Sequence, residues 1–312
     1  MNYILITPVK NEEFYIHDLI ENILSQTKLP VLWVIIDGGS NDLTVSTIKK
    51  YSLQYSWILL KEQTQFSNNR GHLNFALGVR EAYEFLQSYC YMKNISYEFI
   101  GKIDADNLLS PDFFEFLIKQ FQSDPKLGVA CGKSYTINNN CRSIADCINS
   151  NQLTEDNYPE DELPDKRLYR RSSLEEIGGF PVSKYSPDTV TLAKIRIRNW
   201  KIKTFDGTKV INIRADTGIE KNSWKSSRQL GEARYYLDYH PMLFLLSIIY
   251  LTFKKRQYNP IAVTIGYFSG VIAKKPKIED NEIREYFRKK RIHEIVNLNF
   301  RRKFLSIILI FI

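Results

Sequence analysis

Short apolar runs alternate with amphipathic stretches along the first 130 residues. From Ile16 to Leu24, apolar residues recur at the i, i+3, i+4 and i+7 positions, which predicts a helix packed on a sheet. Residues 31–36 form a nearly continuous apolar run, as expected of a buried parallel strand. We predict strands at residues 3–7, 31–36, 57–60 and 97–103, and helices at residues 16–24, 42–51 and 74–91. A further helix is expected to open at Ser110-Pro111-Asp112, which supplies an N-cap, a first-turn proline and a first-turn acid. This alternation indicates βαβ units and an α/β fold with a mostly parallel central sheet.

The pattern changes in the second half of the chain. Residues 135–166 are polar, with three consecutive asparagines and an acidic stretch, and we expect a surface loop there. The elements expected next are a strand at 167–170, a short helix at 172–177, a Gly-Gly turn at 178–179, a helix at 190–198 and strands within 201–214. From Tyr235 onward the pattern is mainly helical. The expected organisation is therefore an α/β domain at residues 1–234 and a helical C-terminal region at residues 235–312.

The composition is that of an ordinary globular protein of 312 residues, with 44% apolar and 25% charged residues. The four cysteines show no Cys-x-x-Cys spacing and are interpreted as reduced thiols of a cytoplasmic protein. The N-terminus enters an apolar strand almost at once, without a basic segment, and does not resemble a secretion signal.

The net charge of +8 is concentrated near the C-terminus. Residues 254–303 contain 14 Lys and Arg and 5 Asp and Glu, which gives +9. The apolar runs at residues 241–251 and 304–312 are too short to cross a bilayer. Such clusters suit a protein that lies on an anionic membrane surface, at the inner face of the cell membrane. A solvated basic face beside buried helices is an equal alternative, and no nucleic-acid-binding motif accompanies the charge.

Polar clusters follow three of the predicted strands. They are residues 7–12, residues 37–42 and Asp104-Ala105-Asp106. Parallel sheets bind ligands beyond the carboxyl ends of their strands, and paired carboxylates suit Mg²⁺ or Mn²⁺ bridged to phosphates. Each cluster alone could be an ordinary turn or helix cap. Together they favour a nucleotide site.

The motif series resembles that of family 2 glycosyltransferases, which have the GT-A fold. The resemblance is carried by Pro8-x-x-Asn11-Glu12, Asp37-Gly38-Gly39-Ser40-Asn41-Asp42-x-Thr44, Asp104-Ala105-Asp106, the run from Arg170 to Pro181, and Asp188-Thr189 before a helix. It covers roughly residues 3–240. The Arg-Arg-x-x-Leu-x-x-Ile-Gly-Gly-Phe run is the most specific of these motifs.

The resemblance implies a role for each matching residue. Asp37 would contact the nucleotide base, Asp104 would lie near the ribose and the metal, and Asp106 would bind Mg²⁺ or Mn²⁺ directly. Asp188 would be the general base of an inverting reaction. The residues expected to bind the nucleotide-sugar are Thr7, Pro8, Asn11, Glu12, Asp37, Gly39, Ser40, Arg70, Asn74, Asp104 and Ala105. Arg214 is interpreted either as a contact to the diphosphate or as a surface charge on an edge strand.

The chain also departs from the family pattern. Gly38 stands where many relatives have a second Asp, and Pro187 replaces the acid that usually precedes the general base. The Gln-x-x-Arg-Trp motif of processive polysaccharide synthases is absent, which favours the addition of one sugar. We expect a metal-assisted enzyme that moves a sugar from a nucleotide-sugar, of the UDP type, to a glycan or lipid-linked acceptor in cell-surface polysaccharide synthesis. The alternatives are a nucleotidyltransferase that makes the sugar nucleotide and a membrane-docked scaffold with an inactive site.

Overall fold

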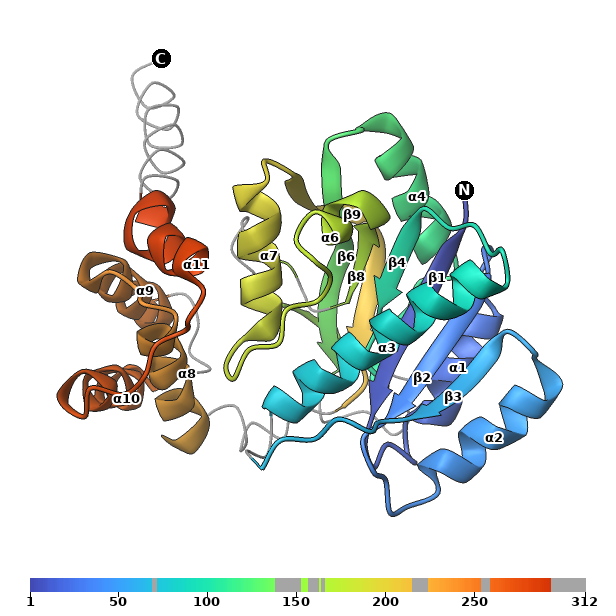
Figure 1. Ribbon diagram of the computed structural model, residues 1–312, viewed down its shortest axis with the longest axis horizontal. Coiled ribbons are helices and arrows are strands. Elements are labelled where there is room, and N and C mark those ends of the chain that lie inside the picture. Colours follow the sequence, from blue (N-terminus) through green and yellow to red (C-terminus); the bar gives the residue numbers. More distant parts are fainter. Residues whose placement is uncertain are drawn as a thin grey trace. The chain divides into compact units, whose positions relative to one another are not determined.

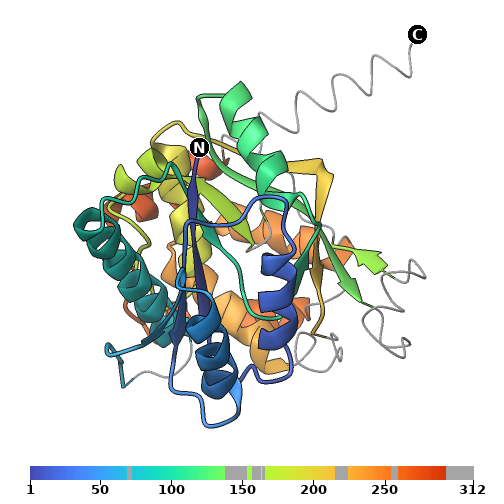
Figure 2. The same ribbon diagram turned by 90° about the vertical axis from the view of Figure 1, so that its right-hand side faces the viewer.

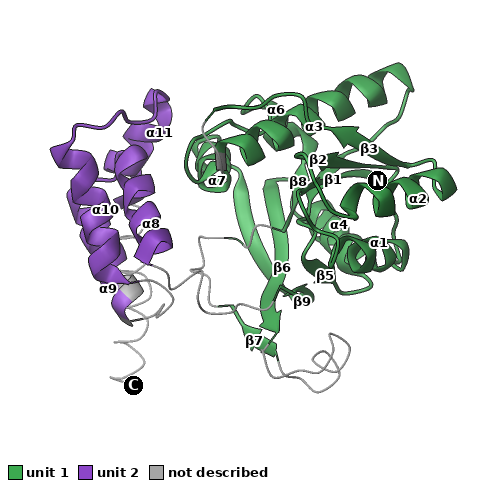
Figure 3. Ribbon diagram, turned by 90° about the horizontal axis from the view of Figure 1, so that it is seen from below, with its two compact units in different colours: residues 1–216 green, residues 217–312 purple. Residues whose placement is uncertain are grey.

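The structure is a computed structural model that describes residues 1–68, 72–137, 153–156, 163, 166–214, 224–253 and 259–292. The chain divides into two compact units, residues 1–216 and 217–312 (Figure 3). The boundary expected from the sequence, after residue 234, falls within helix α8 (Trp224–Tyr236), which belongs to the second unit.

One half of the sheet in the first unit is wholly parallel (Figure 1). It contains β1 (Tyr3–Val9), β2 (Leu32–Asp37), β3 (Ile58–Glu62) and β4 (Phe99–Lys102), in the spatial order β3-β2-β1-β4. Each was predicted from its apolar run, and β2 is buried along its whole length. Because these strands run in the same direction, their carboxyl ends meet at one edge of the sheet.

The other half of the sheet is mixed. Strand β8 (Arg167–Arg170) runs antiparallel to both β4 and β6 (Leu127–Ile137), and β9 (Lys201–Asn212) runs parallel to β6. The short strands β5 (Asn107–Leu109) and β7 (Leu153–Glu155) pair antiparallel with β9 and β6. The α/β fold is confirmed. The expectation of a surface loop over residues 135–166 is wrong in two places, because β6 continues to Ile137 and β7 forms within the same stretch. Residues 138–152, 157–162 and 164–165 lie outside the described residues.

Helices cover both faces of this sheet. Figure 3 shows α3 (His72–Met92) and α6 (Arg171–Glu175) on one side and α1 (Ile16–Leu24) and α4 (Phe113–Ser123) on the other. Helix α2 (Thr44–Gln54) packs beside β3, and α7 (Pro187–Ile197) packs against β9. The α4 face is tied to the sheet by aromatic stacking, with the Tyr3 and Phe114 ring centroids 4.3 Å apart.

The predicted Gly-Gly turn after α6 is present, and it needs its glycines. Gly178 and Gly179 have φ values of +76° and +86°, in the left-handed region. A Cβ on Gly179 would lie 2.5 Å from the Tyr83 ring of α3. Arg80 of α3 also contacts the turn, because its guanidinium donates a hydrogen bond to the Gly178 carbonyl. It therefore locks α3 against the segment that precedes α7.

The second unit is helical, as the sequence predicted for the C-terminal region. It contains α8, α9 (Pro241–Phe253), α10 (Pro260–Ile272), α11 (Asn281–Glu285) and the π-helical turn η1 (Tyr286–Lys290). A small core joins α8, α9 and α10. Among the described residues, no helix combines the length and the apolar character needed to cross a membrane.

Candidate functional site

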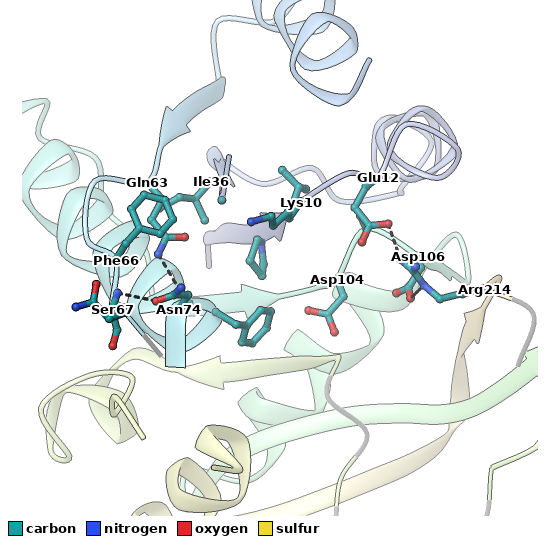
Figure 4. Close-up of a pocket in the computed structure, with 16 residues that line it drawn as sticks. Lys10, Glu12, Ile36, Gln63, Phe66, Ser67, Asn74, Asp104, Asp106 and Arg214 are labelled. Carbon is teal, nitrogen blue, oxygen red and sulfur yellow. Dashed lines mark hydrogen bonds and ion pairs between the residues drawn. The ribbon is translucent and has the colours of Figure 1, made fainter. Parts of the chain in front are cut away.

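A pocket of about 910 Å³ opens at the carboxyl edge of the parallel strands (Figure 4). Its wall comes from the ends of β1 and β2, the segment that follows β3, the start of α3, the β4–β5 connection and Arg214 after β9. The lining residues are Pro8, Val9, Lys10, Glu12, Ile36, Gly38, Gln63, Phe66, Ser67, Asn68, Asn74, Phe75, Asp104, Ala105, Asp106 and Arg214. Its position is the one expected from the direction of the strands.

One end of the pocket gathers three carboxylates and one guanidinium. Figure 4 shows Glu12, Asp104, Asp106 and Arg214 together. Arg214 Nε lies 2.8 Å from Asp106 Oδ2, and its NH2 group pairs with Glu12 Oε2. Asn107 Nδ2 donates to the other Asp106 oxygen at 2.7 Å. Of the two interpretations of Arg214, the structure thus supports a pocket residue and not an isolated surface charge.

The Glu12 carboxyl is strongly affected by this environment. Burial, the largest effect, raises its pKa from 4.5 to about 7, although the neighbouring Arg214 charge lowers it. The negative charges of Asp106 and Asp104 add to the increase. Glu12 therefore changes its protonation near neutral pH, inside the pocket.

The acidic end of the pocket has the chemistry of a hard-cation site. Mg²⁺ and Mn²⁺ prefer oxygen ligands, and Mg²⁺ commonly uses one or two carboxylates together with substrate phosphates. Among the described residues, no group of three or more His, Cys, Asp and Glu side chains is placed to hold a metal ion. Asp104 and Asp106 supply the two carboxylates of that pattern. The guanidinium of Arg214 forms ion pairs with both Glu12 and Asp106, so these two carboxylates already bind a positive charge.

The expected nucleotide-sugar residues divide into two groups. Those that line the pocket are Pro8, Glu12, Asn74, Asp104 and Ala105, and the expected metal ligand Asp106 lines it with them. Those that are not among the lining residues are Thr7, Asn11, Asp37, Gly39 and Ser40. Arg70 lies outside the described residues. The structure does not assign roles to these residues, which stay predictions.

The second group builds the scaffold of the pocket rim. The Asp37 carboxylate accepts hydrogen bonds from the Gly39 and Ser40 amides and from the Ser40 hydroxyl. Asn11, at a φ of 55°, accepts from the Asn41 amide, and its own amide donates to Ser40 Oγ. Thr7 lies in the core, where its hydroxyl accepts from the Trp33 ring nitrogen at 3.0 Å. These bonds clamp the β1 end to the β2 end and so fix Glu12 in place.

The sequence motifs did not identify several residues of the opposite wall. Phe66 is 54% exposed at the pocket, and the Ser67 amide donates to Asn74 Oδ1 at 2.7 Å. Lys10 also lines the pocket, between the predicted Pro8 and Glu12. Lys10 could have been inferred from its place in the first polar cluster. Phe66 follows no motif, so only the fold reveals it.

Asp188, at the start of α7, is held by two buried cations. Lys102 Nζ lies 3.0 Å and Arg167 NH1 3.3 Å from the same oxygen, Asp188 Oδ1. The Lys102 side chain is 1% exposed and lies 5.0 Å from the centre of the Phe75 ring, which lines the pocket. Asp188 is itself 24% exposed and is not among the lining residues. A lysine within the otherwise apolar β4 strand was the available signal for this pairing.

Comparison with known proteins agrees with this geometry. Residues 4–83 match the family described as Glycosyl transferase family 2. The predicted resemblance to family 2 glycosyltransferases is confirmed. The poly-β-1,6-N-acetyl-D-glucosamine synthase of Staphylococcus aureus is 24% identical over 204 residues, which are 62% of this chain and 45% of that protein. The synthase of the same name from Staphylococcus epidermidis is 23% identical over 205 residues. The match thus spans less than half the length of these relatives.

Solved structures show that the fold is that of GT-A glycosyltransferases. The mannosyltransferase PcManGT from Pyrobaculum calidifontis, in complex with GDP-Man and Mn²⁺, has a TM-score of 0.54 and 18% identity, covering 87% of this chain and 75% of its own. TarS 1–349 of S. aureus in complex with UDP-GlcNAc has a TM-score of 0.52 and 14% identity, covering 82% and 74%. At this identity the likeness concerns the fold alone.

Proposed function

We propose that this chain is a glycosyltransferase that moves a single sugar from a nucleotide-sugar to a glycan or lipid-linked acceptor, with inversion at the transferred carbon. The observation that carries the proposal is the grouping of Asp104, Asp106 and Glu12 at one end of the pocket above the parallel strands. A pocket of this volume has room for a nucleotide-sugar. The family match of residues 4–83 supports the same reaction class.

The donor is proposed to be a UDP-sugar. TarS, which was solved with UDP and with UDP-GlcNAc, supports this donor, whereas PcManGT was solved with GDP-Man. The diphosphate would lie at the acidic end, beside Arg214, Asp104 and Asp106. The nucleoside would lie toward the opposite wall, near Pro8 and Asn74, with the Asp37 turn behind it.

The residues of the acidic end would hold Mg²⁺ or Mn²⁺ together with the donor diphosphate. When bound, such a metal supplies positive charge that stabilises the negative charge developing on the leaving diphosphate. Asp106 would be a direct ligand and Asp104 would lie near both ribose and metal. Arg214 would contribute to the same charge neutralisation, because a guanidinium pairs well with phosphate oxygens.

Asp188 is proposed to take the proton of the attacking acceptor hydroxyl. The hydroxyl oxygen forms a bond to the sugar carbon as the bond from that carbon to the diphosphate breaks, so the hydroxyl must lose its proton. Lys102 and Arg167 would fix one Asp188 oxygen and orient the carboxylate toward the acceptor. The acceptor is proposed to be presented at the inner face of the cell membrane, where the +9 segment 254–303 would contact anionic lipid.

Incubation with a panel of nucleotide-sugars and a lipid or glycan extract tests this function. A glycoside product together with free nucleoside diphosphate is expected. A nucleotidyltransferase would instead form a nucleotide-sugar from a sugar phosphate and a nucleoside triphosphate. If neither product forms although UDP binds, the scaffold alternative holds.

A further inference from the structure

Two neighbouring helices of the second unit, α9 and α10, contain no charged residue. Their sequences, residues 241–253 and 260–272, are dominated by Ile, Leu, Phe and Val. Each helix uses one face for the small core of this unit. On that face Phe244 stacks on Tyr267, with ring centroids 4.0 Å apart, and Val263 is fully buried.

The opposite faces of both helices are also apolar, and they are exposed. On α9, Met242, Leu245, Leu246 and Ile249 follow helical spacing and are 37–59% exposed. On α10, Ile261, Ile265, Phe268 and Ile272 follow the same kind of spacing and are 44–82% exposed. We call these eight residues the outer apolar face. Apolar side chains that recur at one-turn spacing on two adjacent helices are unlike the scattered single residues normal on a soluble surface.

The packing of α10 fixes which of its faces remains outward. A Cβ on Gly266 would lie 2.1 Å from the Arg228 carbonyl oxygen of α8, and one on Gly231 would lie 1.9 Å from the Val263 carbonyl oxygen. The two backbones therefore touch along Gly231 and Gly266. Because this close contact uses the glycine side of α10, the α10 residues of the outer apolar face point away from α8.

Basic residues adjoin both helices. In the sequence Lys254-Lys255-Arg256 follows α9 directly, and Lys274 and Lys275 follow α10. The buried Asp238 carboxylate pairs with Lys277, Arg284 and Arg288, so part of the positive charge is used within the unit. Residues 254–303, which include these three cations, carry a net charge of +9, and this charge suits an anionic partner.

We infer that the outer apolar face inserts into the surface of an anionic lipid bilayer, with α9 and α10 lying in the plane of the headgroups. Thirteen residues of helix span about 20 Å, against about 30 Å for the hydrocarbon core, so neither helix reaches across. Apolar helix faces flanked by Lys and Arg bind at this depth. The inference rests on the proposed membrane-associated function and names the surface that would carry it.

The test compares two double variants of the full chain. Ile265→Ser with Phe268→Ser removes the centre of the outer apolar face on α10. Leu53→Ser with Tyr91→Ser changes two apolar residues of the first unit that are 89% and 86% exposed, and serves as the matched control. Sedimentation is measured with vesicles of phosphatidylcholine alone and with vesicles containing about one-third phosphatidylglycerol, at low and high salt.

The wild type and the control should bind the anionic vesicles alike, whereas the α10 variant should lose binding by more than tenfold. High salt should weaken the wild-type binding without abolishing it, because apolar insertion is not screened. Equal binding by both double variants would overturn the inference. So would a wild type that is dimeric without lipid and becomes monomeric in the α10 variant, since the face would then join two copies.

Two further measurements keep the result interpretable. The single variant Ile261→Ser, at a residue 66% exposed in the first turn of α10, should lower binding several-fold even if the double variant is unstable. A large fall in its melting temperature would instead show that the face packs against residues of this chain, and would overturn the inference. UDP binding, measured on the same preparations, should not change in any variant. Loss of vesicle binding with intact UDP binding separates this inference from the proposed reaction.

Discussion

At the scale of single residues, the carboxylate pair after β4 makes the most direct prediction. Asp106→Asn should weaken metal-dependent UDP binding by tenfold or more, because a direct metal ligand loses its charge. Asp206→Asn, at a β9 side chain that is 83% exposed, is the matched control and should bind normally. Calorimetric titration with UDP, with and without Mn²⁺, measures both. Unchanged metal-dependent affinity in the Asp106 variant would remove the proposed metal site.

Glu12 predicts an unusual dependence of stability on pH. Its carboxyl should ionise near pH 7 in the folded chain and near its ordinary pKa of 4.5 when unfolded. Between these values the folded state retains a proton that the unfolded state has released, so this group lowers stability as pH rises from about 4.5 to about 7. Glu12→Gln removes the effect. The melting temperature of the variant, relative to the wild type, should therefore be higher at pH 8 than at pH 5.

Glu115→Gln provides the comparison for this experiment. A hydrogen bond from Lys119 lowers the pKa of the exposed Glu115 carboxyl, so this group, unlike Glu12, takes up no proton on folding. Its substitution should shift the melting temperature equally at pH 5 and pH 8. If the shift in melting temperature caused by Glu12→Gln were also the same at pH 5 and pH 8, the Glu12 carboxyl would have an ordinary pKa in the folded chain.

Asp188 tests the proposed proton transfer. Asp188→Asn keeps the shape of the side chain but cannot accept a proton, so single-turnover transfer should slow by about 10²–10⁴. Donor affinity should change little, since Asp188 does not line the pocket. Near-normal transfer would assign the base to another residue. Loss of donor binding would place Asp188 in the nucleotide or metal site.

At the scale of elements, the contact between α8 and α10 predicts a sharp sensitivity to volume. Gly266→Ala should destabilise the second unit by about 1–3 kcal/mol, because the new methyl group would meet the Arg228 carbonyl. Ile261→Ala, on the exposed face of the same helix, should cost less than about 0.5 kcal/mol. Denaturant unfolding followed by circular dichroism measures the difference. Equal stability of the two variants would contradict the close helix contact.

The elements also show what the sequence could and could not predict. The four parallel strands and helix α1 followed from apolar periodicity, because their burial is set by local pattern. Strands β5 and β7 are three residues each, too short for a periodic signal, and their pairing depends on segments far along the chain. The sequence predicted that Glu12, Asp104 and Asp106 lie together, because each follows a strand of the parallel half of the sheet. Arg214 and Phe66 reach the pocket from segments whose position only the fold determines.

At the scale of the whole molecule, we consider how many sugars the protein adds to one acceptor. The curated relatives are named as synthases of a polymer, yet the alignment covers 45% of their length and does not establish their activity here. The Gln-x-x-Arg-Trp motif of processive synthases is absent from this sequence. We therefore expect each acceptor to gain one sugar, even with a large excess of donor.

Mass spectrometry of the acceptor after prolonged incubation measures this directly. Each acceptor should gain the mass of one sugar residue and no more. The amount of UDP released should then be limited by the amount of acceptor supplied. Asp188→Asn, which should bind donor but transfer slowly, is the control. It measures how much donor is hydrolysed, and how much sugar is attached, without the proposed proton acceptor. A ladder of products that lengthens with donor concentration would show that the chain extends its own product. Such a ladder would leave the reaction class intact, because polymer synthesis and single-sugar transfer form the same kind of glycosidic bond.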